Sequence, residues 1–382
     1  MLIPATVLTG FLGSGKTTLL KRVLSEAHGQ KIAIIENEFG EENIDNDILV
    51  SETSEQIIQM SNGCVCCTIR EDLRTTLRDL AAKKRSGELD FERVVIETTG
   101  LADPGPVAQT FFMDDEIAES YLLDSILTLV DAVHAQTQLN DRQEARRQVG
   151  FADQIFISKA DLVSPAELSA LQHRLTHMNP RAPQKSVHFG EVAIADVFDL
   201  KGFNLNTKLE IDPDFLAEAD DHHHHDHAHG GHDHSDHVHG PNCNHPSHEA
   251  GGEHGGHHHH YDDDVKSFVF KSKRAFDPAK LEDFLGAIVN IYGPKMLRYK
   301  GVLFMKGTDK KVIFQGVHQL MGSDLGPAWG REEPRMNKMV FIGIDLPRDI
   351  FLQGLEQCLV WVQSARNLNS FWIDMISSYI EL

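Results

Sequence analysis

Short, uninterrupted apolar runs recur along the first half of the chain. Each is rich in valine and isoleucine and does not alternate with polar residues, which is typical of strands covered on both faces, as in a parallel sheet. The predicted strands are Ile3–Thr9, Lys31–Glu36, Val94–Glu97, Ser125–Asp131 and Gln154–Ser158.

Amphipathic helical patterns separate these strands, at Lys16–Ala27, Glu71–Lys84, Asp141–Gly150 and Pro165–His177. Strands and helices that alternate at this spacing predict a doubly wound α/β domain with a parallel sheet, the P-loop NTPase class once the glycine-rich segment described below is included. We place this domain at residues 1–205.

A second folded region begins at Val265 and mixes strand and helix patterns. It predicts a small α+β domain at residues 265–347, followed by a helical extension at residues 348–382. Its predicted strands are Val265–Phe270, Met296–Met305, Lys311–Val317 and Met339–Asp345, and its predicted helices are Pro278–Asn290 and Arg348–Gln363.

Composition changes abruptly between the two regions. Residues 212–264 contain no Lys or Arg but 13 Asp or Glu, a large share of the net charge of −21. With almost no apolar residue, this segment cannot bury a core, and residues 206–264 are predicted to be a disordered linker. The acidity argues against nucleic acid and anionic membrane surfaces as partners. No long apolar run and no signal-like start are present, so we expect a cytoplasmic protein.

A phosphate-binding motif follows the first predicted strand. Residues 10–18 read GFLGSGKTT, which fits GxxxxGK(S/T) between a strand and a helix. Backbone N–H groups of such a loop face phosphate, Lys16 would reach the β- and γ-phosphates, and Thr17 would bind Mg²⁺. Glu97, at the end of another strand, supplies an acid for the same Mg²⁺. Gly100 opens a loop that can respond to a γ-phosphate.

The segment Ser158-Lys159-Ala160-Asp161 follows a late strand of the same sheet and resembles the (N/S/T)KxD element of GTPases. A carboxylate here can accept both N1–H and the exocyclic amine of guanine, a pair that adenine does not offer. We therefore favour GTP over ATP. The expected catalytic residues are Lys16, Thr17 and Glu97. The expected nucleotide-binding residues are Gly10, Gly13, Ser14, Gly15, Lys16, Thr17, Thr18, Gly100, Ser158, Lys159 and Asp161.

Three thiols, Cys64, Cys66 and Cys67, lie within four residues on a predicted turn. Thiolates that converge in this way suit Zn²⁺, with Co²⁺ and Cu(I) as other choices; a redox pair or buried thiols are the alternatives. The chain has five cysteines, and three of them are crowded together. This pattern is not that of a disulfide framework, and it indicates a reducing compartment. The acidic segment 36–41 could also contact a metal or be only a solvated loop.

The linker carries 17 of the 23 histidines, interleaved with Asp and Gly. Neutral imidazole binds Zn²⁺, Ni²⁺, Cu²⁺ and Co²⁺, and the acidic residues favour dications, so this histidine tract predicts weak, multivalent metal binding. Its densest runs are His222, His223, His224 and His225, then His257, His258, His259 and His260.

In this order, GFLGSGKTT, IENEFGE, GCVCC, ETTGLADPGP and SKAD resemble the CobW-type metal-chaperone GTPases, in particular the YjiA-like branch. RYKG, FQGV and MVFIGI, at residues 298–301, 314–317 and 339–344, resemble the family's C-terminal domain. The resemblance implies a slow GTPase that binds zinc, or cobalt, at Cys64, Cys66 and Cys67 and delivers it to a client protein. It also implies metal contacts at Glu36 and Glu41. Ser158 departs from the Asn of many GTPases.

The resulting hypothesis is a metallochaperone in which GTP and Mg²⁺ order the segments around the cysteines, so that nucleotide state sets the affinity for metal. A client metalloprotein would dock on the C-terminal domain, and the sequence also allows a homodimer. Three alternatives remain: a passive histidine-rich metal store with a structural nucleotide, a metal-sensing regulator, and an ATP-using P-loop kinase with incidental cysteines.

Overall fold

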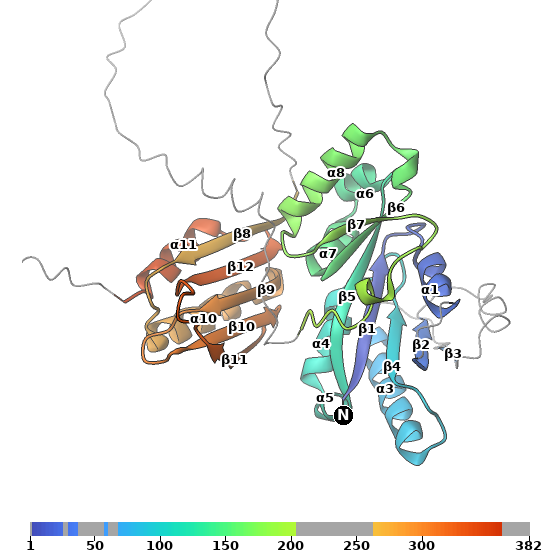
Figure 1. The fold of residues 1–382 in the computed structure, drawn as a ribbon, viewed down its shortest axis with the longest axis horizontal. Helices are drawn as coiled ribbons and strands as arrows, with labels where there is room; N and C mark the ends of the chain where they lie inside the picture. Colours follow the sequence, from blue (N-terminus) through green and yellow to red (C-terminus); the bar gives the residue numbers. More distant parts are fainter. Residues whose placement is uncertain (1, 26–29, 37–56, 60–67, 204–262, 361–382) are drawn as a thin grey trace, which may run out of the picture.

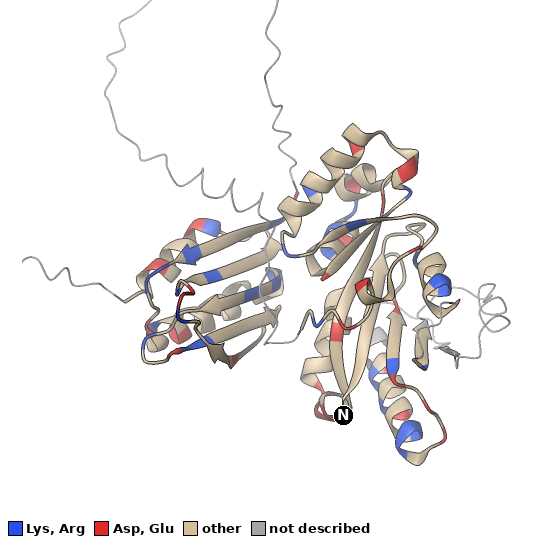
Figure 2. Ribbon diagram, in the orientation of Figure 1, with Lys and Arg blue, Asp and Glu red and all other residues tan. Residues whose placement is uncertain are grey.

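The computed structural model describes residues 2–25, 30–36, 57–59, 68–203 and 263–360. Two sheets with helices between and around them make up this part of the chain (Figure 1). Lys and Arg are interspersed with Asp and Glu over both halves in the view of Figure 2. None of the helices in these ranges is long and apolar enough to cross a membrane.

The first sheet confirms the predicted doubly wound fold. Within the described residues it has seven strands in the order β3-β2-β4-β1-β5-β6-β7, and every pairing is parallel. Their carboxyl ends therefore meet at one edge, where ligands bind in such folds. The strands are β1 (Ile3–Gly10), β2 (Ile32–Glu36), β3 (Ile57–Gln59), β4 (Arg93–Glu97), β5 (Tyr121–Asp131), β6 (Gln154–Ser158) and β7 (Gln184–Val187).

Helices cover both faces of this sheet. On one face, α1 (Lys16–Ser25) buries Leu19, Leu20 and Val23 in one apolar cluster with β1 and β5. The other face is covered by the remaining helices of this region, which share a second cluster with it. These are α3 (Thr68–Ser86), α4 (Pro104–Met113), α5 (Asp115–Ser120), α6 (Ala135–Asp141), α7 (Gln143–Phe151) and α8 (Pro165–Met178).

The C-terminal sheet is antiparallel, in the order β11-β10-β9-β12-β8. One of its faces packs against helices α10 and α11 in a phenylalanine-rich core. The other shares the apolar cluster of the first region, with Leu297, Val340 and Ile342 among its members. The elements are β8 (Val265–Ser272), α10 (Pro278–Tyr292), β9 (Met296–Leu303), β10 (Lys310–Val317), β11 (Leu320–Ala328), β12 (Asn337–Ile344) and α11 (Arg348–Gln357).

The sequence predicted some boundaries wrongly. The predicted helix 141–150 spans parts of two helices, because the chain is extended at Arg142 between α6 and α7. The predicted helix 348–363 ends at Gln357. Since Phe351, Leu355 and Leu359 are buried in the same cluster as β9 and β12, the C-terminal core continues beyond residue 347. Strands β3, β7 and β11, helices α4 and α5 and all of α6 except its last residue were not predicted.

Candidate functional site

The loop after β1 has the backbone that its glycines predict. Gly10, Gly13 and Gly15 have φ angles of +146°, +75° and +98°, which side-chain-bearing residues rarely adopt. Gly10 is also crowded, because a Cβ there would lie 2.4 Å from the Leu129 carbonyl oxygen. The loop wraps tightly at the carboxyl edge of the sheet and leads directly into α1, an arrangement that presents backbone N–H groups to an anion.

The two polar side chains that open α1 are held by neighbouring oxygens. Lys16 Nζ donates to the carbonyl oxygens of Gly10 at 2.8 Å and Phe11 at 3.3 Å. Thr17 Oγ1 donates to Glu97 Oε1 at 3.3 Å. The predicted pair of a hydroxyl and a carboxylate is therefore present, with hard oxygen donors of the kind that suits Mg²⁺.

Glu36 and Glu97 end neighbouring strands. In the parallel ladder, Gln59 of β3 pairs with Glu36 of β2, and Glu36 pairs with Glu97 of β4. Strands lie about 4.8 Å apart, so the end of β3 is roughly 10 Å from Glu97 along the sheet. The chain that leaves β3 toward the cysteines thus starts at the same edge as the phosphate-binding loop.

The predicted base-recognition segment contacts the phosphate-binding loop. Ser158 Oγ donates to the Ser14 carbonyl oxygen at 2.7 Å, and Lys159 Nζ donates to the Gly13 carbonyl oxygen at 3.1 Å. Asp161 is half exposed, with its Oδ1 3.4 Å from His188 Nδ1. The Ser158 side chain therefore joins the end of β6 to the phosphate-binding loop.

Asp131 is a site residue that the sequence analysis missed. This buried carboxylate accepts from Lys159 Nζ at 2.6 Å and from the Val133 N–H at 2.9 Å, and its Oδ2 lies 2.8 Å from His134 Nδ1. Burial raises its pKa, but the bonds from Lys159, His134 and Val133 outweigh this, so the pKa lies below its usual value. Its position at the end of a parallel strand, beside the end of β6, was the available signal.

The Gly100 loop, residues 98–103, lies against the phosphate-binding loop. A Cβ at Gly100 would lie 2.6 Å from the Leu12 side chain and 2.7 Å from its backbone nitrogen. Gln148 Nε2 donates to the carbonyl oxygens of Gly100 at 3.1 Å and Ala102 at 3.0 Å. Arg147 pairs with Asp103 at 2.7 Å. Nothing in the sequence pattern singled out Gln148 or Arg147, because they lie within an ordinary helix.

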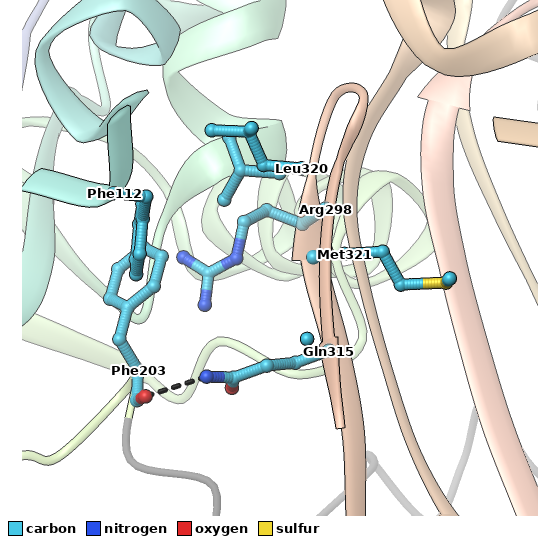
Figure 3. A pocket seen from close by; sticks show the side chains of 9 residues that line it. Phe112, Phe203, Arg298, Gln315, Leu320 and Met321 are labelled. Carbon is cyan, nitrogen blue, oxygen red and sulfur yellow. Dashed lines mark hydrogen bonds between the residues drawn. The ribbon is translucent and has the colours of Figure 1, made fainter. Parts of the chain in front are cut away.

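A pocket of about 300 Å³ lies between α4 and the C-terminal sheet (Figure 3). Arg298 points into it and lies 3.8 Å from the centre of the Phe203 ring, while Met321 points away. Gln315 Nε2 donates to the Phe203 carbonyl oxygen at 2.6 Å. None of the residues that the sequence predicted for nucleotide or metal lines this pocket.

The structure brings Glu97, Gly100, Ser158 and Lys159 against the phosphate-binding loop and the start of α1. Asp161 lies beside His188 instead. Within the residues it describes, no three His, Cys, Asp or Glu are grouped to hold a metal. The other predicted metal ligands lie outside the described residues: Cys64, Cys66, Cys67, Glu41, His222, His223, His224, His225, His257, His258, His259 and His260.

Comparison with known proteins agrees with these observations. Residues 4–185 match the family described as "CobW/HypB/UreG, nucleotide-binding domain". Residues 265–359 match "Cobalamin synthesis protein cobW C-terminal domain".

Two curated relatives cover most of the chain. The chain is 37% identical to the zinc chaperone YjiA of Escherichia coli, over 91% of this chain and 96% of that protein. It is 30% identical to the zinc chaperone CobW of a Sinorhizobium species, over 90% and 93%. The crystal structure of Zn(II)-bound YjiA GTPase from E. coli matches with a TM-score of 0.70 and 34% identity, over 94% of this chain and all of that chain.

The resemblance found in the motifs is thus confirmed across both sheets. The chain belongs to the CobW family of P-loop GTPases and is itself a GTPase.

Proposed function

We propose that this GTPase is a zinc chaperone, which binds zinc at Cys64, Cys66 and Cys67 and transfers it to a client protein according to its nucleotide state. The observation that carries the proposal is topological. β3 ends at Gln59, level with Glu36 and Glu97, and α3 begins at Thr68. The cysteine segment therefore follows a strand that ends at the same edge of the sheet as the phosphate-binding loop. Relatives named zinc chaperones support the choice of zinc.

Different groups among the described residues would bind the phosphates and the Mg²⁺ of the nucleotide. Backbone N–H groups of the loop and of α1 would hold the phosphates, and Lys16 would exchange its two carbonyl partners for phosphate oxygens. Thr17 and Glu97 would hold Mg²⁺, which when bound neutralises phosphate charge. A client protein docks on the C-terminal domain in this proposal. The histidine tract raises the local concentration of metal.

The deciding experiment measures Zn²⁺ affinity by competition with a chelating dye, on protein lacking His222–His260. It is done with and without Mg²⁺ and a non-hydrolysable GTP analogue. We expect tighter binding with the analogue, and loss of that tight site in Cys66→Ala. Cys358→Ala is the matched control, since that thiol is buried against the Gly354 and Lys280 carbonyl oxygens. Affinity that is indifferent to nucleotide would favour the metal store or the regulator instead.

Base recognition gives a separate prediction. Asp161→Asn should weaken GTP binding about 10- to 100-fold, because an amide cannot accept both guanine N–H groups as a carboxylate does, and charged hydrogen bonds contribute ~1.5–3 kcal/mol. Fluorescent GTP and ATP analogues would measure the affinities. Asp196→Asn makes the same change at an ion pair with Lys185, where neither residue is predicted to bind nucleotide, and should leave GTP binding unaltered. Unchanged GTP preference in Asp161→Asn would assign guanine recognition to other residues.

A further inference from the structure

Helix α7 lies between the Gly100 loop and the C-terminal sheet, and it contacts both. Towards the nucleotide site, Gln148 and Arg147 bond the loop. Towards the C-terminal sheet, Gly150 allows a close approach: a Cβ there would lie 2.7 Å from Leu297 and 3.2 Å from Val265. A single turn of helix thus contacts the loop through Arg147 and Gln148, and β8 and β9 through Gly150.

On the side that faces α7, Gln148 donates hydrogen bonds to two carbonyl oxygens of the Gly100 loop. Its side chain is buried, with the residue only 1% exposed, and one carboxamide nitrogen serves the carbonyl oxygens of both Gly100 and Ala102. Its own backbone oxygen accepts from Thr128 Oγ1 at 2.8 Å, which fixes α7 on β5. Buried carbonyl groups that lose their partner are costly, so the conformation of the loop depends on this amide.

The first turn of α4, which follows the loop, meets the C-terminal domain. Asp103 accepts from the Gly105 N–H at 2.9 Å, which caps α4, and it pairs with Arg147. His318, between β10 and β11, packs on Phe151 with ring centroids 5.3 Å apart. Its Nε2 would lie 2.6 Å from a Cβ at Gly105, so there is no room for a side chain between them.

We propose that Gln148 is a positioning residue for GTP hydrolysis, which holds the Gly100 loop against the phosphate-binding loop, and that α7 transmits the state of this loop to the turn between β10 and β11. This inference rests on the proposed role of the Gly100 loop beside the γ-phosphate. It assigns Gln148 no contact with the nucleotide. If the nucleotide state changes the position of α7, the coupling must be reciprocal. A partner that binds the C-terminal domain and shifts α7 must then also change the affinity for GTP.

The first test is kinetic and uses the full chain. Gln148→Met keeps the shape of the side chain and removes the donor. We expect kcat for GTP hydrolysis to fall at least ~10-fold, because small displacements at a reacting centre have large effects. GDP affinity should stay within about twofold, since GDP lacks the phosphate that faces the loop. Gln154→Met is the matched control: Gln154 is also buried and donates to two carbonyls, at 3.3 Å and 2.9 Å, but not to the loop.

A second variant separates positioning from packing. Gln148→Glu has no donor while it is ionised, but a protonated carboxyl group donates one hydrogen bond. The ratio of its kcat to that of the wild type should therefore rise as pH falls, which a loss of packing alone would not produce. A ratio that does not vary with pH, or a kcat of Gln148→Met within twofold of the wild type, would overturn the positioning role.

Hydrogen exchange tests the coupling to the C-terminal domain. In the wild type, amides of residues 317–320 should exchange differently with GDP and with a non-hydrolysable GTP analogue, and this difference should disappear in Gln148→Met. No difference in the wild type would refute the coupling through α7. If Gly100→Ala impairs hydrolysis and Gln148→Met does not, the inference fails while the role of the loop stands. If neither impairs hydrolysis, the role of the loop fails as well.

Discussion

Asp153→Ala is expected to lower the free energy of unfolding by about 3–5 kcal/mol, the cost typical of removing one partner from a buried ion pair. Asp153 lies at the junction of the two regions. Arg298 of β9 donates to its two carboxylate oxygens at 2.9 Å and 3.2 Å, and both side chains are almost fully buried. The Ile126 N–H also donates to it, at 2.9 Å.

The cost is large because the surroundings of Asp153 are positively charged. Arg181 lies 3.7 Å from the same carboxylate. Burial, followed by the charges of Arg181 and Arg298, lowers the pKa of Lys300 to about 8, and Asp153 is the group that opposes this. Without the carboxylate, three cations would remain close together in a medium that solvates them poorly.

Urea unfolding at pH 7, followed by far-UV circular dichroism, would measure the loss. Asp90→Ala is the matched control, because its ion pair with Lys31 is exposed to solvent and its removal should leave the unfolding midpoint nearly unchanged. A loss below ~1 kcal/mol for Asp153→Ala would contradict the prediction. It would mean that the Phe203 ring and the Phe151 and Gly202 carbonyl oxygens are sufficient to stabilise the buried charge of Arg298 without Asp153.

Local patterns were enough to predict the parallel sheet and the backbone conformation of the glycine-rich loop. Continuous apolar strands mark burial on both faces, and the glycine pattern of residues 10–18 has a backbone requirement that the φ angles at Gly10, Gly13 and Gly15 meet. These signals lie within a few neighbouring residues. Strand β11 was missed because its glycines, Pro327 and exposed positions give no apolar alternation.

The contacts that join the two regions could not be predicted, because they depend on pairs far apart in the chain. Asp153 and Arg298, or Gln148 and Gly100, become neighbours only through the packing of α7. The RYKG motif illustrates the difference. Its Arg298 faces Asp153, while Tyr299 points to the other face of β9 and donates to the His318 and Leu320 carbonyl oxygens. The motif indicated the family, but not that its alternate residues have separate tasks.

Gly100→Ala is expected to lower kcat for GTP hydrolysis by about 100-fold, the effect of displacing a loop at a reacting centre by roughly 1 Å. The added methyl group would lie 2.6 Å from Leu12 Cδ2 and 2.7 Å from the Leu12 nitrogen, distances that real Cβ contacts do not show. Either the Gly100 loop or the phosphate-binding loop must therefore move away from the other.

The measurement is single-turnover GTP hydrolysis, with Gly286→Ala as control. A Cβ at Gly286 would meet nothing within 4 Å, and the residue lies inside α10, so alanine there should leave hydrolysis unchanged and stabilise the fold by about 0.5–1 kcal/mol. Adding Leu12→Ala to Gly100→Ala removes the side-chain clash but not the clash with the backbone nitrogen. The double variant should therefore stay slow. Recovery of hydrolysis would show that the Leu12 side chain, and not the close approach of the two backbones, limits the reaction.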